Sequence, residues 1–253
     1  MTVSELYKKL SEYMPESLRL DWDNDGIMVC SDFSAEVSAV LITLDVTEEI
    51  VDYAIERGFN LIISHHPLIF RPVSEVTEKN HVSRKIIKLV SNNVAVFSFH
   101  TRADIVSGGV NDILARLIGL KNVTPFGEGG LGRIGYLDTD TELDVFADGI
   151  KAVLHADSIK VSDGYNTVKK VAVVGGDGKD FVNDAIAEDA DTYVSGRLSY
   201  NVMEEASEMG INLIEAGHYY TEFPITSFFA ELVSKFDGNA YIEIADSNMI
   251  KTL

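Results

Sequence analysis

Two adjacent histidines, His65 and His66, follow a short apolar run and precede a proline. The run Leu61 to Ser64 predicts a buried strand, and Pro67 prevents its continuation into a sheet interior. The histidines therefore lie where a strand ends, and open α/β sheets bind ligands at the carboxyl ends of their strands. Because neighbouring side chains of an extended chain point in opposite directions, we expect the two imidazoles to serve two different metal ions.

Four further candidate ligands also follow predicted strands: His100, Asp104, His218 and Glu222. One tetrahedral ion needs four or fewer protein ligands, so the whole set indicates two ions with a carboxylate able to bridge them. Nitrogen and oxygen donors without sulfur favour Zn, Mn, Fe, Ni or Co over Mg or Ca. Paired ions about 3.5–4 Å apart activate water and hold a departing oxygen, which is hydrolase chemistry. The alternative is a set of unrelated residues near loop ends.

The elements that position these residues alternate between strand and helix. Apolar spacing predicts a first helix within residues 2–20, and later helices at 47–58 and 82–92. The predicted strands of this half are the following: 27–30, 39–44, 61–64 and 94–99. A βαβ alternation of this kind is typical of a mostly parallel sheet covered by helices.

The second half of the chain repeats the first. The sequence of residues 170–195 aligns with that of residues 39–64 at a constant offset of 131. After a deletion the offset becomes 118, and His100 then aligns with His218 and Asp104 with Glu222. We therefore predict two related α/β lobes from an internal duplication, in a three-layer arrangement. The alternative is that any two βαβ segments look alike.

The expected division places residues 1–124 and 212–253 in a first α/β lobe that carries most metal ligands, with 125–211 as an inserted second lobe. The five glycines between Gly127 and Gly135 predict a mobile connector. Downstream, we expect helices at 137–154 and 221–236 and strands at 158–162 and 240–244, the last of which returns to the first sheet.

Three polar motifs have competing interpretations. DWDNDG, residues 21–26, matches the start of a calcium loop, but position twelve is Asp32 instead of glutamate, so an Asx-type turn that packs Trp22 is favoured. GGDGKD, residues 175–180, is a tight strand-to-helix turn in preference to a phosphate cradle. SGGVND, residues 107–112, either presents backbone amides to a substrate or caps a helix.

The composition excludes several classes of protein. Forty acidic and 21 basic residues give a formal charge of -19, which disfavours nucleic acid as a partner. The single cysteine, Cys30, can form neither an internal disulfide nor a thiolate metal cage. No signal peptide or membrane-length apolar run is apparent, so we expect a soluble cytoplasmic protein without a membrane partner.

Four motifs, taken in order along the chain, resemble those of the GTP cyclohydrolase 1 type 2 homologues, also called Nif-three-like proteins. They are DWDNDG, SHHP, H-T-x-x-D with GGVND, and GHYYTE. The resemblance covers essentially the whole chain. It implies a Nif-three-like fold, two divalent metal ions per subunit and a toroidal homohexamer with sites facing an internal cavity. By similarity, His65 and His218 hold one ion, His66 and Asp104 hold the other, and Glu222 bridges them, while His100 orients a ligand or substrate.

One segment departs from the family pattern. Where many members carry T-G-E or T-G-D and a following histidine, this chain has Arg197 and Asn201. The expected function is a metal-dependent hydrolase of a small, GTP-like or other nucleotide-derived substrate, with His100 and Glu222 as catalytic residues. The alternative is a non-catalytic metal-binding or scaffold protein that acts through the ring.

Overall fold

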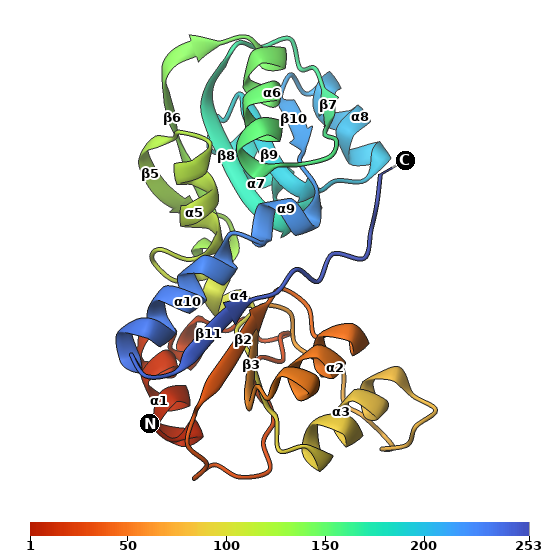
Figure 1. Ribbon diagram of the computed structural model, residues 1–253. Coiled ribbons are helices and arrows are strands. Elements are labelled where there is room, and N and C mark those ends of the chain that lie inside the picture. The colour runs from red at the N-terminus through yellow and green to blue at the C-terminus, as the bar shows by residue number, and fades with distance from the viewer. Residues whose placement is uncertain (253) are drawn as a thin grey trace. The chain divides into compact units, whose positions relative to one another are not determined.

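The structure is a computed structural model that describes residues 1–252 (Figure 1). It divides into two compact α/β units. The first comprises residues 1–103 and 225–249, and the second comprises residues 104–224 with the C-terminal residues from Ile250. Each unit has its own sheet with helices on both faces, as predicted for two three-layer α/β lobes.

The first unit is built on a five-stranded sheet in the order β1-β4-β3-β2-β11. Its strands are β1 (Gly26–Val29), β2 (Ala39–Thr43), β3 (Leu61–Ser64), β4 (Ala95–Ser98) and β11 (Tyr241–Ile244). All neighbours are parallel except β1 and β4. Because β11 pairs with β2, the chain does return to its first sheet near its C-terminus, as predicted.

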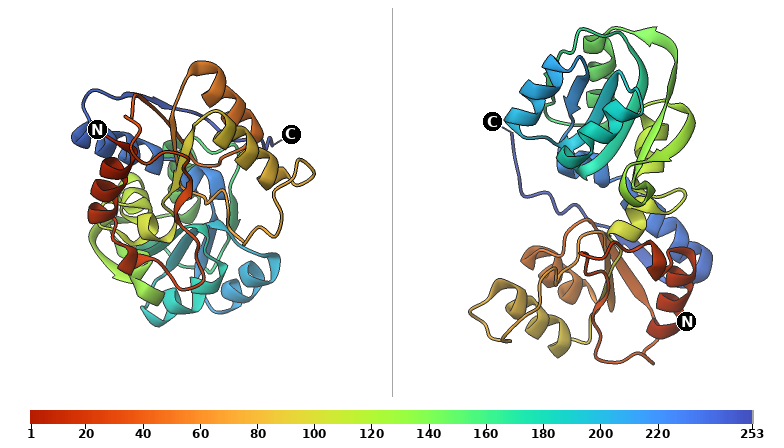
Figure 2. Two further views of the ribbon diagram at one scale, coloured as in Figure 1. Left: turned by 90° about the horizontal axis from the view of Figure 1, so that it is seen from below. Right: turned by 180° about the vertical axis from the view of Figure 1, so that it is seen from behind.

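Two pairs of helices cover this sheet. They are α1 (Val3–Tyr13), α2 (Glu48–Arg57), α3 (His81–Ser91) and α10 (Ile225–Phe236). Helices α2 and α3 pack on one face, over a core that includes Leu41, Ile62 and Val96, and α1 and α10 lie on the other (Figures 1 and 2). Helix α1 is shorter than predicted because the chain reaches Pro15, which is followed by the short 3₁₀ helix Glu16–Leu18.

The second unit is built on a six-stranded sheet in the order β5-β6-β8-β9-β10-β7. Its strands are β5 (Lys121–Phe126), β6 (Gly132–Thr141), β7 (Lys160–Ser162), β8 (Val168–Asp177), β9 (Thr192–Arg197) and β10 (Asn212–Glu215). Its α-helices are α5 (Val110–Leu117), α6 (Leu143–Leu154), α7 (Val182–Ala187), α8 (Tyr200–Glu208) and α9 (His218–Glu222), while α4 (Thr101–Ile105) spans the boundary with the first unit. Helices α5 and α6 pack on one face of this sheet, and α7 and α8 lie on the other (Figure 2).

Three predicted segments differ from the structure. The glycine-rich stretch 127–135 is no connector between lobes, because it forms the 3₁₀ helix Glu128–Gly130 and the start of β6, within a hairpin of β5 and β6. The predicted helix 137–154 begins only at Leu143, since residues up to Thr141 extend β6 along β8. Similarly, Pro224 separates the predicted helix 221–236 into α9 and α10.

The observed boundaries of the units lie elsewhere than the expected ones. The sequence pattern predicts residues 104–124 and 212–224 in the first lobe. In the structure α5 packs on β8, and β10 pairs with β9 in the second sheet. These contacts place both segments in the second unit, together with Asp104, His218 and Glu222.

The βαβ pairing register repeats between the two sheets. In the first, Val40 of β2 lies opposite Leu61 of β3, and in the second, Val171 of β8 lies opposite Thr192 of β9. Both residues of the second pair lie 131 positions after those of the first, as the sequence offset predicts.

The next strand pair corrects the second offset by one residue. Ala95 of β4 lies opposite Leu61, whereas Asn212 of β10 lies opposite Thr192, which gives an offset of 117 instead of 118. At this offset His218 corresponds to Thr101 and not to His100. The H-x-x-x-D and H-x-x-x-E motifs are therefore not at equivalent positions of the two sheets.

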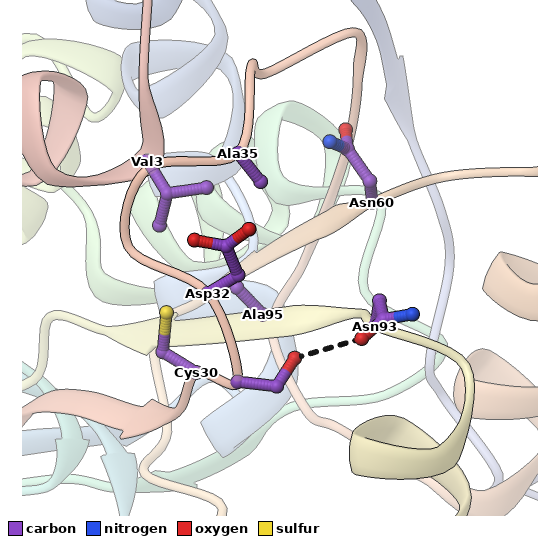
Figure 3. A pocket seen from close by; sticks show the side chains of 8 residues that line it. Val3, Cys30, Asp32, Ala35, Asn60, Asn93 and Ala95 are labelled. Atoms are coloured by element: carbon purple, nitrogen blue, oxygen red, sulfur yellow. Dashed lines mark hydrogen bonds between the residues drawn. The ribbon is translucent and has the colours of Figure 1, made fainter.

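A cavity of about 300 Å³ lies in the first unit, and no histidine is among its lining residues. Figure 3 shows the side chains that line it. Its lining includes Cys30, Asp32, Asn60 and Asn93, and Ser31 Oγ donates to Asn93 Oδ1 at 3.2 Å. Asn60 and Asn93 precede β3 and β4, so the cavity lies at the amino ends of the parallel strands. Burial raises the pKa of the Cys30 thiol, which disfavours the reactive thiolate.

Within residues 1–252, none of the helices combines the length and the apolar character needed to span a bilayer.

Candidate metal centre

The first unit gathers three histidines at the carboxyl ends of β3 and β4. Ring nitrogens of His65, His66 and His100 all lie within 4.8 Å of one another. The ring centroids of His65 and His66 are 5.0 Å apart, so these neighbours do not point to opposite faces as an extended chain would require. The reason is that β3 ends at Ser64 and the backbone bends over the two histidines.

Each of these rings is held by an acceptor at Nδ1. His65 Nδ1 lies 2.9 Å from the carbonyl oxygen of Phe99, His66 Nδ1 lies 2.7 Å from Asp45 Oδ1, and His100 Nδ1 lies 2.8 Å from Asp23 Oδ1. A carbonyl or carboxylate oxygen can only accept, so each Nδ1 carries the proton. In the neutral imidazole the lone pair is then on Nε2, which is the tautomer and support that metal-ligating histidines use.

Asp23 is the most strongly held carboxylate of this cluster. Its side chain is fully buried and also accepts from the backbone N and the Oγ1 of Thr101, at 3.0 and 2.7 Å. Burial raises the pKa of Asp23, but the hydrogen bonds from His100 and Thr101 outweigh it and lower the pKa to about 2. Asp23 is therefore an anion that fixes the orientation of His100.

Asp25 and Arg102 form a buried ion pair beneath the same loop. Arg102 Nε donates to Asp25 Oδ2 at 2.9 Å, both side chains are fully buried, and the guanidinium also donates to the carbonyl oxygen of Met14. Burial raises the pKa of Asp25, against the opposing effect of Arg102.

The DWDNDG segment thus uses two aspartates to hold HTR, residues 100–102, and sequence reasoning missed this role. The D-x-D spacing that suggested a calcium loop is the pattern that could have indicated it. Trp22, which we expect to pack at the start of a strand, is 58% exposed, and its ring contacts those of Phe70 and His100.

The second unit gathers the other three candidate ligands. His218 Nε2 and Glu222 Oε2 lie 2.9 Å apart on consecutive turns of α9, and a carboxylate oxygen of Asp104 lies within 4.8 Å of one of Glu222. Asp104 and Glu222 are 8% and 4% exposed. Buried carboxylates are costly unless a cation or a hydrogen bond compensates them.

Two glycines allow α9 to approach the sheet this closely. Gly176 of β8 has φ +67°, and a Cβ there would overlap the Glu222 carboxylate and lie 3.3 Å from His218 Nε2. A Cβ at Gly196 of β9 would lie 2.6 Å from the carbonyl oxygen of Gly176 and 2.8 Å from the Cα of His218. The first three residues of the GGDGKD motif therefore end β8, and Gly176 among them accommodates the carboxylate of Glu222. Lys179 and Asp180 begin the 3₁₀ helix Lys179–Phe181.

The SGGVND motif ties α5 to this strand. Asn111 Oδ1 accepts from the backbone N of Gly175 at 2.7 Å, and its Nδ2 donates to the carbonyl oxygen of Leu131 at 2.9 Å. Asp112 Oδ2 accepts from the backbone N of Gly108 at 2.7 Å. The motif therefore orders the start of the helix, as one of its two interpretations proposed.

Arg197 and Asn201, the departures from the family pattern, lie at the end of β9 and in the first turn of α8. The side chain of Arg197 is 70% exposed, and its closest carboxylate is Asp177 at 3.6 Å. Asn201 is also exposed.

Comparison with known proteins decides the family. The model of the family Duf34/NIF3 (NGG1p interacting factor 3) matches residues 1–252. The chain belongs to the Duf34/NIF3 family. The resemblance seen in the motifs is thereby confirmed.

Similar members of the Duf34/NIF3 family come from bacteria and archaea. A protein of Clostridium acetobutylicum named GTP cyclohydrolase 1 type 2 homolog is 35% identical over 88% of this chain and 86% of its own length. A protein of the same name from Methanocaldococcus jannaschii is 31% identical, over 94% and 97%.

Solved structures confirm the Nif-three-like fold. A hypothetical protein of Staphylococcus aureus aligns with a TM-score of 0.90 and 27% identity, over 100% of this chain and 99% of that one. Reduced HcgD from Methanocaldococcus jannaschii aligns with a TM-score of 0.86 and 29% identity, over 96% and 97%.

Proposed function

We propose that this Duf34/NIF3 protein binds two divalent metal ions per subunit through His65, His66, Asp104, His218 and Glu222, with Glu222 as the bridging carboxylate. The observation that carries the proposal is the shared tautomer of two of these ligands, His65 and His66, since each Nδ1 donates to a fixed acceptor and leaves the lone pair on Nε2. The remaining donors are carboxylates and one more imidazole, a set suited to Zn, Mn, Fe, Ni or Co.

The proposal requires that the histidines of the first unit and the Asp104, His218 and Glu222 cluster of the second contribute to the same ions. Neither cluster alone offers enough ligands for two ions with a bridging carboxylate. The strongest support within the second unit is Glu222, a buried carboxylate that β8 accommodates with a glycine.

The proposed reaction is hydrolysis of a small, possibly nucleotide or GTP-like, substrate. Two bound divalent ions would supply the activation of a water molecule and the stabilisation of the departing oxygen. Among the residues of this chain, His100 is the candidate for proton transfer. Its Nδ1 donates to the buried carboxylate of Asp23, so Nε2 is the atom that would accept or donate the proton.

The second candidate function is a non-catalytic metal-binding or scaffold protein that acts through a homohexameric ring in the cytoplasm. The description of the family as NGG1p interacting factor 3 favours a role in protein interaction. Each unit also exposes large apolar side chains, such as Phe33 in the first and Tyr165 and Tyr200 in the second.

Metal content per chain tests the proposal. Protein purified and loaded separately with Zn, Mn, Fe, Ni or Co is expected to retain two ions per chain, and Glu222→Gln is expected to lose them. Glu208→Gln, at the exposed end of α8, is the matched control and is expected to retain both ions. If no tested metal is retained by the folded wild-type chain, the proposal fails.

Turnover separates the enzyme from the scaffold. The loaded protein is screened against nucleotides and phosphoesters, and activity that Glu222→Gln abolishes while the fold is retained supports the hydrolase. Full metal content without turnover on any substrate, together with a hexameric mass by sedimentation, supports the scaffold.

A further inference from the structure

An edge-to-face cluster of three rings, Trp22, Phe70 and His100, lies beside His65 and His66 of the first unit. The ring centroid of Trp22 lies 6.0 Å from that of His100 and 6.4 Å from that of Phe70, and Phe70 lies 6.3 Å from His100. The interplanar angles are 79°, 66° and 88°. His100 in turn lies 5.2 Å from His65 and 5.6 Å from His66, so the aromatic cluster borders the candidate metal ligands directly.

Trp22 and Phe70 are both exposed, at 58% and 45% of their surface. Single exposed apolar residues are normal, but adjacent exposed aromatic rings at the edge of a polar site are typical of a ligand-binding surface. Tryptophan and phenylalanine offer large flat areas on which planar rings stack.

The segments that carry these rings are held in place. Asn24 Nδ2 donates to the carbonyl oxygen of Ile69, which joins the loop of Trp22 to that of Phe70. The backbone N of Leu20 donates to Thr101 Oγ1 at 3.1 Å, and Asp23 accepts from His100 and Thr101. An aromatic surface fixed before binding loses little conformational entropy when a ligand arrives.

We propose that Trp22 and Phe70 form an aromatic platform for a planar heteroaromatic ring, such as a nucleobase, before it reacts. Because the two planes meet at 66°, the bound ring stacks on one side chain and packs its edge against the other. This inference rests on the proposed function and specifies its substrate class. A ring on the platform borders His100, whose Nδ1 donates to Asp23. The His100 ring in turn contacts the rings of His65 and His66, so only His100 separates the bound ring from these two candidate metal ligands. The formal charge of -19 favours recognition through the uncharged base over recognition through phosphate groups.

Trp22 is the only tryptophan of the chain, so its fluorescence reports the platform directly. The protein is titrated with guanosine, adenosine, cytidine and uridine, with ribose as the ligand without a heteroaromatic ring. Excitation at the red edge of the tryptophan absorption avoids absorption by the nucleosides. We expect saturable quenching by at least one nucleoside and none by ribose.

Substitution of Phe70 tests the second wall of the platform. Phe70→Leu is expected to raise the dissociation constant about 5- to 150-fold, the range for loss of one base-stacking aromatic side chain. Phe33→Leu is the control, because Phe33 is 50% exposed in the same unit but lies in the segment beside the Cys30 cavity. It is expected to bind like the wild type. Calorimetry gives the same comparison for Trp22→Leu, which has no tryptophan fluorescence.

Three outcomes overturn the inference. These are no saturable quenching by any nucleoside, equal affinities for the wild type and Phe70→Leu, or a concentration-dependent blue shift of the Trp22 emission, which would show that a second copy of the chain covers the platform. Metal content is measured in the same samples. Metal-bearing protein without quenching refutes the platform alone, whereas quenching of a protein that binds no metal refutes the proposed function alone.

Discussion

Gly176→Ala tests whether β8 is shaped around the carboxylate of Glu222. A Cβ at this position would overlap Glu222 Oε1 and lie 3.0 Å from its Cδ. Glu222 is only 4% exposed, so its carboxylate must move within a packed environment. We expect the variant to fold with a displaced Glu222 and, under the proposed function, to lose bound metal.

The matched control is Gly119→Ala. Gly119 lies in the same unit with φ +88°, and a Cβ there would have no heavy atom of the described residues within 4 Å beyond its own chain neighbours. Both variants pay the cost of a left-handed backbone, about 1–2 kcal/mol. Only Gly176→Ala adds overpacking, about 1–3 kcal/mol, which gives a total of about 2–5 kcal/mol.

The assay is thermal unfolding of both variants and the wild type, with metal content measured on the same samples. For a chain of this size, each kcal/mol lowers the melting temperature by about 2–4 °C. We expect Gly176→Ala to melt below Gly119→Ala and to be the one that loses metal. Equal melting temperatures and equal metal contents would refute the reasoning that the glycine makes room for Glu222.

Two further predictions concern the aspartates of residues 21–26. Because the pKa of Asp23 falls from 3.8 to about 2 on folding, its ionisation contributes about 2 kcal/mol of stability that is present above pH 3.8 and lost as the pH falls through 2. Denaturant unfolding between pH 5 and 2 is expected to show this loss in the wild type and a shallower one in Asp23→Asn, and parallel pH profiles would contradict it. Arg102→Leu is expected to cost about 3–5 kcal/mol because it leaves Asp25 as an unpaired buried charge, whereas Lys179→Ala, which removes an exposed ion pair with Asp177, is expected to cost at most about 1 kcal/mol. Similar losses of unfolding free energy in the two variants, measured by denaturant unfolding, would contradict the expected difference between a buried and an exposed ion pair.

Local sequence patterns are sufficient to predict the elements of the first unit and to identify the metal-type donors. The apolar residues of the run Leu61–Ser64 are enough to predict a strand, and Pro67 predicts where it ends. Neither prediction needs information from another part of the chain. The donors at the strand ends could be recognised because parallel strands bring their carboxyl ends to one edge of a sheet.

The residues that support those donors become apparent only in the folded chain. Asp23 and Asp25 hold residues more than 70 positions away, and no local pattern reveals such partners. The one-residue difference in register between β4 and β10 likewise depends on which strand each one pairs with. Hydrogen-bond partners of buried carboxylates and strand registers are set by contacts between distant segments, whereas periodicity along the sequence records only which face of an element is buried.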